Sequence, residues 1–365
     1  MENRGLIFIP DISGFTRFVN DVEIDHSRHI IQELLEVIIN ANQIGLEISE
    51  IEGDAVLFYK YGEKPELEAL YKQVEKMFRD FHKHLIAYDH RRLCQCKACS
   101  GAIELTLKVV THYGEFTGYN VKNFSKLIGK DIIVAHQLLK NDIEQHEYWL
   151  ITDGLAENKL TANLPENLEW TKSKKQTETG VIPFEYAHLT HLKKELPSDP
   201  PLDLEIKNKK RVISTYREFD TDVLTLLHGV VDFSTRKDWN AFIKDIDYVS
   251  DESLPRLGTS HHCILEKGQS IMYTSSYTYI PADTYLPEKI EYSETDDKKS
   301  YAIYYTLNRI TGNRTSLTVD FYLRNNPIAL AIFRLFEKKK MENKVALSMN
   351  RLSQLIKEIK IYPAS

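Results

Sequence analysis

The chain has 365 residues, of which 42% are hydrophobic and 27% are charged, and its formal net charge is −6. This length predicts two domains, or three at most, and the charge shows none of the basic excess that nucleic-acid-binding proteins carry. No segment reaches the ~18 consecutive apolar residues that span a bilayer, and the first residues lack the pattern of a signal peptide. We therefore expect a cytoplasmic protein that is not an integral membrane protein and binds no nucleic acid.

The first part of the chain alternates short strands and helices. Residues 6–11 predict a strand that ends at Asp11, and residues 26–44 carry apolar side chains at helical spacing. Two β-rich segments within 46–61 flank Gly53 and predict a hairpin. The further predicted elements are a helix at 67–85, a strand at 103–116, a helix at 129–142 and strands at 148–153 and 184–189. This order is typical of an α+β sandwich with helices on one face of an antiparallel sheet.

A change of amino-acid composition divides the chain into two parts. Residues 193–210 contain three prolines, many charges and little to bury, which predicts a linker between a first domain at 1–192 and a second at 211–365. The second part reads as a strand, one or two helices, a run of strands and a closing helix. Its elements are expected at 211–219, 220–246, 257–265, 270–280, 288–294, 300–310, 314–324 and 326–360. This order predicts a curved antiparallel sheet that grips one long helix.

Two aspartates end up close together if the first strand pairs with the hairpin. Asp11 ends the strand and Asp54 lies at the hairpin tip, so antiparallel pairing would bring the two carboxylates face to face. Such a pair repels itself unless a cation lies between, and Mg²⁺ or Mn²⁺ with a triphosphate suits this arrangement. Gly14 and Gly53 let the backbone turn tightly, so that amides near the first turn can approach phosphate oxygens. The alternative is that both aspartates only cap strand ends and turns.

The motifs "FIPDISGFTRF" at 8–18 and "EIEGDAVLFY" at 50–59 resemble the two metal-carrying motifs of class III nucleotidyl (adenylate or guanylate) cyclases. The later segments "VVTHYGEF" and "GKDIIVAHQLL" are similar to further parts of that family. The resemblance implies a ferredoxin-like, cyclase-type sandwich in which Asp11 and Asp54 hold Mg²⁺ or Mn²⁺. It also implies that the backbone at Ile12, Gly14 and Phe15 holds phosphate, and that active molecules are head-to-tail homodimers.

The chain departs from this family where the chemistry is done. Active members carry Asn and Arg on the late helix to orient the ribose and stabilise the transferring phosphoryl group, whereas this chain has Ile133 and Gln137 there. Loss of one such electrostatic contact commonly reduces the rate by ~10²–10³. Glu50 matches the base-reading residue of guanylate cyclases, but Lys126 at the other base-reading position fits neither type. Glu50 and Lys126 either contact a base or are ordinary solvated charges.

Three of the four cysteines lie close together. Cys94, Cys96 and Cys99, with His90 just before them, could supply three thiolates and an imidazole to a structural zinc ion. The spacing is also compatible with a metal-trafficking or redox cluster, or with a loop of thiols without a metal. Three cysteines so close together are in any case unlike a disulfide framework.

The second domain resembles the START/polyketide-cyclase-like (SRPBCC) superfamily in its element order, in "RKDWNAFI" and in "RLGTSHHCIL". The resemblance implies a helix-grip fold that binds a hydrophobic small molecule or lipid. The strands at 270–280 and 301–307 are rich in tyrosine, and we expect some of these rings to line an amphipathic pocket while others face solvent.

Three functions remain open from the sequence. The first is a signalling or sensor protein that binds a metal–nucleotide with weak or no turnover, together with an apolar ligand. The second is an active nucleotidyl cyclase with substitute residues at the transition state. The third is a lipid- or small-molecule-binding protein on a degenerate cyclase scaffold.

Overall fold

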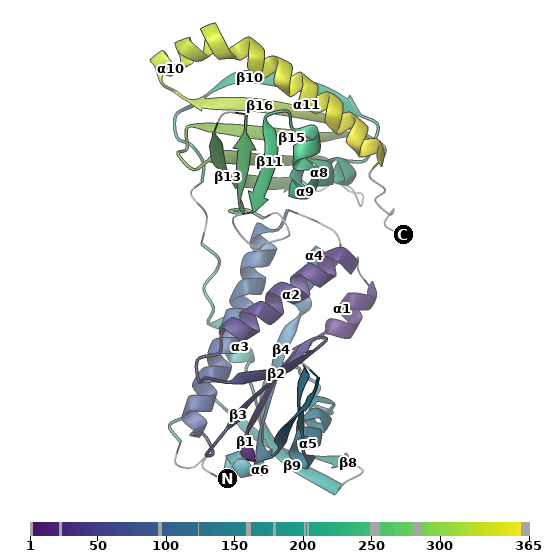
Figure 1. Cartoon of the computed structure of the whole chain (residues 1–365), viewed down its shortest axis with the longest axis vertical. Helices are drawn as coiled ribbons and strands as arrows, with labels where there is room; N and C mark the ends of the chain where they lie inside the picture. The colour runs from purple at the N-terminus through teal and green to yellow at the C-terminus, as the bar shows by residue number, and fades with distance from the viewer. Residues whose placement is uncertain are drawn as a thin grey trace. The chain divides into compact units, whose positions relative to one another are not determined.

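The computed structural model describes residues 3–21, 24–93, 97–122, 124–157, 162–177, 180–200, 202, 204–248, 256–266, 268–280 and 287–358. The chain divides into two compact units (Figure 1). The first unit comprises residues 1–90 and 96–199, and the second comprises residues 91–95 and 200–365. Each unit has its own sheet and hydrophobic core. Among the described residues, no helix is long and apolar enough to cross a membrane.

The first unit is built on a sheet of seven strands in the order β2-β3-β1-β4-β7-β9-β8. These strands are β1 (Arg4–Ser13), β2 (Glu47–Glu52), β3 (Ala55–Tyr61), β4 (Thr106–Glu115), β7 (Tyr148–Thr152), β8 (Trp170–Thr177) and β9 (Gly180–His188). β4 and β7 run parallel, and the other neighbours are antiparallel. The expectation of a wholly antiparallel sheet was therefore wrong. β5 (Thr117–Val121) and β6 (Phe124–Ile128) form a separate hairpin.

Helices of the first unit complete its core. They are α1 (Phe15–Asp21), α2 (Ile24–Asn40), α3 (Leu67–Arg91), α4 (Lys97–Gly101), α5 (Lys130–Leu139), α6 (Asp153–Ala156) and α7 (Thr190–Lys194), with the 3₁₀ turn η1 (Ala102–Glu104). Leu67, Leu70, Val74 and Met77 of α3 are buried, at the helical spacing that predicted this helix.

The sheet of the first unit is covered on both faces, whereas the sequence predicted helices on one face only. Successive side chains of a strand point to opposite faces. On β1, Ile7 and Ile9 pack in one cluster with residues of α5, while Leu6 and Phe8 of the opposite face are also buried. A strand buried on both sides reads as a continuous apolar run, which is what "LIFIP" is.

The second unit contains a curled antiparallel sheet of seven strands in the order β10-β16-β15-β14-β13-β12-β11 (Figure 1). Its strands are β10 (Lys209–Phe219), β11 (Ile243–Tyr248), β12 (Ser260–Leu265), β13 (Gln269–Ile280), β14 (Lys289–Asp296), β15 (Tyr301–Thr311) and β16 (Arg314–Arg324). The segment 220–246, predicted as helical, ends its helices at Trp239, and Ile243 already begins the edge strand β11.

Helices close one side of this curled sheet (Figure 1). They are α8 (Val223–Val231), α9 (Phe233–Trp239), α10 (Pro327–Ile332), the π-helical turn η2 (Phe333–Glu337) and α11 (Lys338–Glu358). The long C-terminal helix was predicted as one element, and Asn326 caps its start by accepting from the amides of Ile328 and Ala329. Leu226 of α8 and Leu352 of α11 share one buried cluster with Leu307 and Leu317 of the sheet.

A buried ion pair lies within the second unit. Arg236 of α9 and Glu294 of β14 have side chains only 1% and 2% exposed. Nη1 of Arg236 donates to both carboxylate oxygens at 2.8 and 2.9 Å, and Nη2 donates to the carbonyl of Val230 at 2.8 Å. Burial alone would raise the pKa of Glu294, but Arg236 and a hydrogen bond from Tyr292 hold this pKa below its ordinary value.

We expect Arg236→Met to destabilise the second unit by about 3–5 kcal/mol, because it leaves the Glu294 carboxylate buried without its partner. The double variant Arg236→Met/Glu294→Leu should recover at least half of this loss, since no buried charge remains. Urea unfolding of the three proteins near neutral pH measures both effects. A double variant as unstable as the single one would mean that packing of the arginine stem, not the charge pair, stabilises the unit.

Candidate functional site

Asp11 and Asp54 lie next to each other at one end of the first unit's sheet. β1 and β3 pair antiparallel with Asp11 opposite Ala55, and the amide of Ile12 donates to the carbonyl of Asp54 at 3.0 Å. This is the adjacency that the hairpin argument predicted. Gly53 and Gly14 turn the backbone beside the two aspartates. Their φ angles of 63° and 91° are values that residues other than glycine rarely adopt.

Both carboxylates have raised pKa values, and the charge of Asp11 contributes to the shift of Asp54. Burial, followed by the negative charge of Asp11, raises the pKa of Asp54 to about 6. Burial also raises the pKa of Asp11, although Lys108 opposes the shift. Two neighbouring carboxylates that are half-buried destabilise the folded state when both are ionised. The arrangement therefore favours a positive charge between them.

Lys108 is the residue that sequence reasoning missed. It lies on β4 directly opposite Asp11, and its Nζ is 3.5 Å from Oδ1 of Asp11. The same ammonium donates to the carbonyl of Leu139 at 3.2 Å, and the side chain is only 13% exposed. The available signal was a lysine between the apolar residues of "LTLKVV", but its meaning depends on the pairing of β4 with β1.

The donor set of this site fits a hard divalent cation in part. Two carboxylates supply the oxygen ligands that Mg²⁺ and Mn²⁺ prefer. However, Asp11 already forms an ion pair with Lys108. A cation at this position therefore competes with an ammonium group that belongs to the protein.

The two residues at the expected transition-state positions lie one turn apart on α5. Ile133 is 56% exposed, and Oε1 of Gln137 is buried without a hydrogen-bond partner among the described residues. The nearby amide of Asn141 is already engaged, because its Nδ2 donates to the carbonyl of Leu138 and to the hydroxyl of Tyr148. Neither position carries a positive charge.

The first turn of α5 is bound to β4 by a hydrogen bond and an ion pair. Asp131 accepts from the amide of Glu115 at 2.6 Å and pairs with Nε2 of His112 at 3.1 Å. The hydrogen bond from His112 lowers the pKa of Asp131. A Cβ on Gly114 would lie 2.3 Å from the Asp131 side chain, so only glycine leaves room for this contact. The "HYG" and "GKD" segments of the sequence therefore meet in space.

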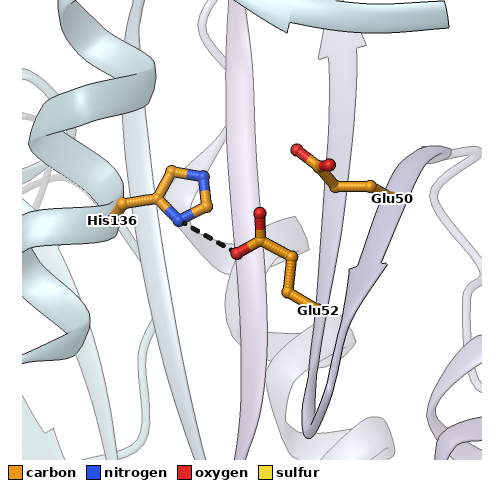
Figure 2. A group of neighbouring side chains, drawn as sticks. All are labelled: Glu50, Glu52 and His136. Atoms are coloured by element: carbon orange, nitrogen blue, oxygen red, sulfur yellow. Dashed lines mark ion pairs between the residues drawn. The ribbon is translucent and has the colours of Figure 1, made fainter.

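The expected base-reading residues pair with each other. Glu50 of β2 forms an ion pair with Lys126 of β6. Glu52 points toward His136 of α5 across the same face, with Oε2 3.5 Å from Nδ1 (Figure 2). Ligand atoms of Glu50, Glu52 and His136 lie within 4.8 Å of one another. We assign no metal to this group, because exposed acidic clusters are common and Lys126 already neutralises Glu50.

The described residues include only part of the cysteine cluster. Cys94 and Cys96 lie outside the described residues. Cys99 is buried on α4 with its Sγ 3.4 Å from Nδ1 of His26, while His90 is exposed near the end of α3. Zinc binding by these residues stays a prediction, and His26 is a neighbour that the sequence did not indicate.

The second unit encloses a cavity of about 430 Å³. Most of its wall is apolar, and Tyr301 and Tyr305 line it, as expected for some of the tyrosines. Tyr304, in contrast, contacts Lys209 and is not part of the wall. The further lining residues include Phe242, Ile303, Val319, Phe321, Val345 and Met349.

Polar atoms at the cavity wall lack partners. Nε of Arg236, Nε1 of Trp239 and both ring nitrogens of His261 are buried without a hydrogen bond among the described residues, and all three side chains line the cavity. Burial lowers the pKa of His261 to about 4, so its ring is neutral near pH 7. Buried polar groups are normally satisfied. These atoms themselves have almost no accessible surface, so a ligand in the cavity would reach them only after a local shift of the side chains.

Comparisons with known proteins give one family model that matches part of the chain and one partial relative. Residues 31–148 match the family described as "Protein of unknown function (DUF2652)". Over 127 residues the chain is 34% identical to an uncharacterized protein of Mycobacterium tuberculosis, Rv2561/Rv2562. This match covers 34% of the chain and 58% of that relative's length.

Among solved structures, the chain is similar to several nucleotidyl cyclase domains. One is the guanylate cyclase domain of RhGC from Catenaria anguillulae in complex with GTP, at 14% identity and a TM-score of 0.38, covering 51% of this chain and 96% of that one. Another is a bacterial light-regulated adenylyl cyclase, at 15% identity and a TM-score of 0.39, covering 53% and 56%. Likeness of this degree says nothing of activity.

Proposed function

We propose that the first unit binds a divalent cation together with a nucleoside triphosphate, and that it turns this nucleotide over weakly or not at all. The observation that carries the proposal is the pair Asp11 and Asp54, whose closeness and burial raise the pKa of Asp54 to about 6. A bound Mg²⁺ or Mn²⁺ would neutralise these carboxylates and bind phosphate oxygens. Resemblance of the motif around Gly14 to nucleotidyl cyclases supports phosphate as the accompanying group.

Weak turnover follows from the residues of α5. Ile133 has no hydrogen-bonding group, and Gln137 has no charge with which to stabilise a transferring phosphoryl group. Loss of such a contact commonly reduces a rate by ~10²–10³. Glu50 is held by Lys126, so a base would have to displace this ion pair before Glu50 could recognise it. The site therefore suits binding better than catalysis.

We expect Mn²⁺ with a nucleoside triphosphate to raise the thermal stability of the protein. At a ligand concentration about 100 times the dissociation constant, the gain is about 2–3 kcal/mol. Asp54→Asn should abolish the shift, because it removes one carboxylate, whereas Glu63→Gln, which changes an exposed acid of the same unit, should keep it. A panel of triphosphates, measured by differential scanning fluorimetry, tests this and identifies the base.

The same protein should make little or no cyclic nucleotide in the presence of Mn²⁺. Robust production by the purified protein, lost in Asp11→Ala, would contradict the binding proposal and favour an active cyclase with substitute residues. If no triphosphate shifts the melting temperature of the wild type, the first unit is a scaffold without a nucleotide site.

Without a metal, we expect Asp54→Asn to stabilise the protein near neutral pH. The folded pKa of about 6 lies above the ordinary 3.8, so the folded state binds more protons and stability falls as the pH rises between these values. Because the side chain is only half-buried, solvent screening reduces the expected gain to about 1 kcal/mol. Denaturant unfolding in a chelator should show this gain above pH 6 and its loss near pH 4. A variant less stable than wild type near pH 7 would identify Asp54 as a structural cap.

We propose a second binding function for the cavity of the second unit. Its wall is mostly apolar, and the side chains of Arg236, Trp239 and His261 that line it carry polar atoms buried without a hydrogen bond among the described residues. The charge of Arg236 is already balanced by Glu294. Two N–H donors and a neutral imidazole can satisfy a hydroxyl or carbonyl oxygen without leaving a net charge buried. The ligand class that fits best is a mainly apolar molecule with one neutral oxygen group.

We expect 1-decanol to stabilise the second unit more than decanoate at equal free concentration, because a carboxylate would bring an unbalanced charge into the cavity. Trp239→Phe keeps an aromatic ring but removes the N–H donor, and it should weaken decanol binding. Trp170→Phe in the first unit is the matched control. Calorimetric titration measures the affinities, and tighter binding of decanoate than of decanol would overturn this choice of head group.

A further inference from the structure

Four large apolar side chains are exposed together on the C-terminal helix. Ile328, Ile332, Leu335 and Phe336 are 73%, 54%, 77% and 76% exposed, and we call them the apolar helix face. They recur at positions i, i+4, i+7 and i+8, which gather side chains on one side of a helix. The opposite side holds the helix to its unit, because Leu330 and Phe333 are buried.

Basic residues surround the apolar helix face. Arg334 and the run Lys338–Lys340 are all exposed, and the stretch 327–344 contains five basic residues against two acidic ones. Lys338 pairs with Glu342, while within the described part of the chain Arg334 and Lys339 form no ion pair. This concentration of positive charge contrasts with the net charge of −6 for the whole chain.

We propose that the apolar helix face docks the second unit onto an anionic membrane surface. Apolar side chains beside Lys and Arg are the pattern of helices that lie in the plane of a bilayer interface. Protein–protein interfaces, in contrast, are depleted of lysine in their centre. Each basic residue near an anionic surface strengthens binding about fivefold, and the exposed Leu335 and Phe336 would insert among the lipid chains.

The apolar helix face and the cavity of the second unit share one segment of the chain. Phe333 and Glu337 of η2 and Lys340 and Met341 of α11 line the cavity, so the segment that carries the apolar helix face also forms part of the cavity wall. A π-helical turn such as η2 leaves the regular hydrogen-bond ladder and is frequent at functional sites. The membrane proposal does not depend on the cavity being filled, nor on the nucleotide site.

The full-length protein should sediment with vesicles made of equal parts phosphatidylcholine and phosphatidylserine, and much less with phosphatidylcholine alone. High salt should weaken this binding. Leu335→Asp/Phe336→Asp should reduce the partition coefficient more than tenfold, while Val181→Asp, which changes an exposed apolar residue of the first unit, should leave it unchanged. Lys338→Gln/Lys339→Gln should reduce the preference for the anionic lipid about 25-fold without removing the apolar side chains.

Several results would overturn the proposal. One is a wild-type protein that stays in the supernatant with anionic vesicles. Others are binding that survives in the Leu335→Asp/Phe336→Asp variant, or binding that ignores lipid charge and salt. Light scattering provides the remaining test: a wild-type dimer that becomes monomeric in this variant would identify the face as a contact between two copies of the chain. Circular dichroism checks that each variant is folded.

Discussion

The candidate site of the first unit depends on the register of one strand. β1 is paired with β3 on one side and β4 on the other, so its register fixes Asp11 against the hairpin tip and against Lys108 together. A slip of one residue would turn Asp11 to the opposite face of the sheet. The continuous burial of β1 guards against such a slip, because both faces would then exchange their packing partners. The same double burial that holds the acid in place also keeps water from screening it.

The sequence predicted elements well where periodicity follows burial, and less well where it does not. Helix α3 and strands β15 and β16 carry clean patterns and lie where they were expected. The first four residues of β11 fall within the segment predicted as helical, because "IKDIDY" is a charged edge strand with one neighbour and solvent permits polar side chains there. The closeness of Asp11 and Asp54 could be predicted from the sequence because each residue lies at the end of an element with a clear pattern. Asp11 ends the first strand, and Asp54 lies at the tip of a hairpin. Lys108 could not, because its role arises from a strand that lies far along the chain, and no local pattern states which strands are neighbours.

The sequence predicted an amphipathic pocket in the second unit but not its size. Alternation in the strands indicates which side chains face inward, but the space left between sheet and helix depends on how strongly the sheet curls. The balanced pair Arg236 and Glu294 also escapes a sequence reading, since the two residues are 58 positions apart in the chain. Their pairing removes net charge from an apolar wall while leaving a donor nitrogen unused. A pocket built in this way discriminates by the hydrogen bonds of a ligand more than by its charge.

Lys108 gives the proposed nucleotide site an internal counter-ion. A metal that takes Asp11 releases this ammonium from its carboxylate, and the released charge then lies beside whatever anion accompanies the metal. An anion alone would instead meet the carboxylate of Asp54 beside the ion pair of Asp11 and Lys108, and a metal alone would separate this pair and leave a lysine that is only 13% exposed. Exchange of partners thus couples the two ligands: cation and phosphate satisfy the site jointly, and each is a poor ligand without the other. A site of this kind would respond to a metal–phosphate complex as a single species and only weakly to either component on its own.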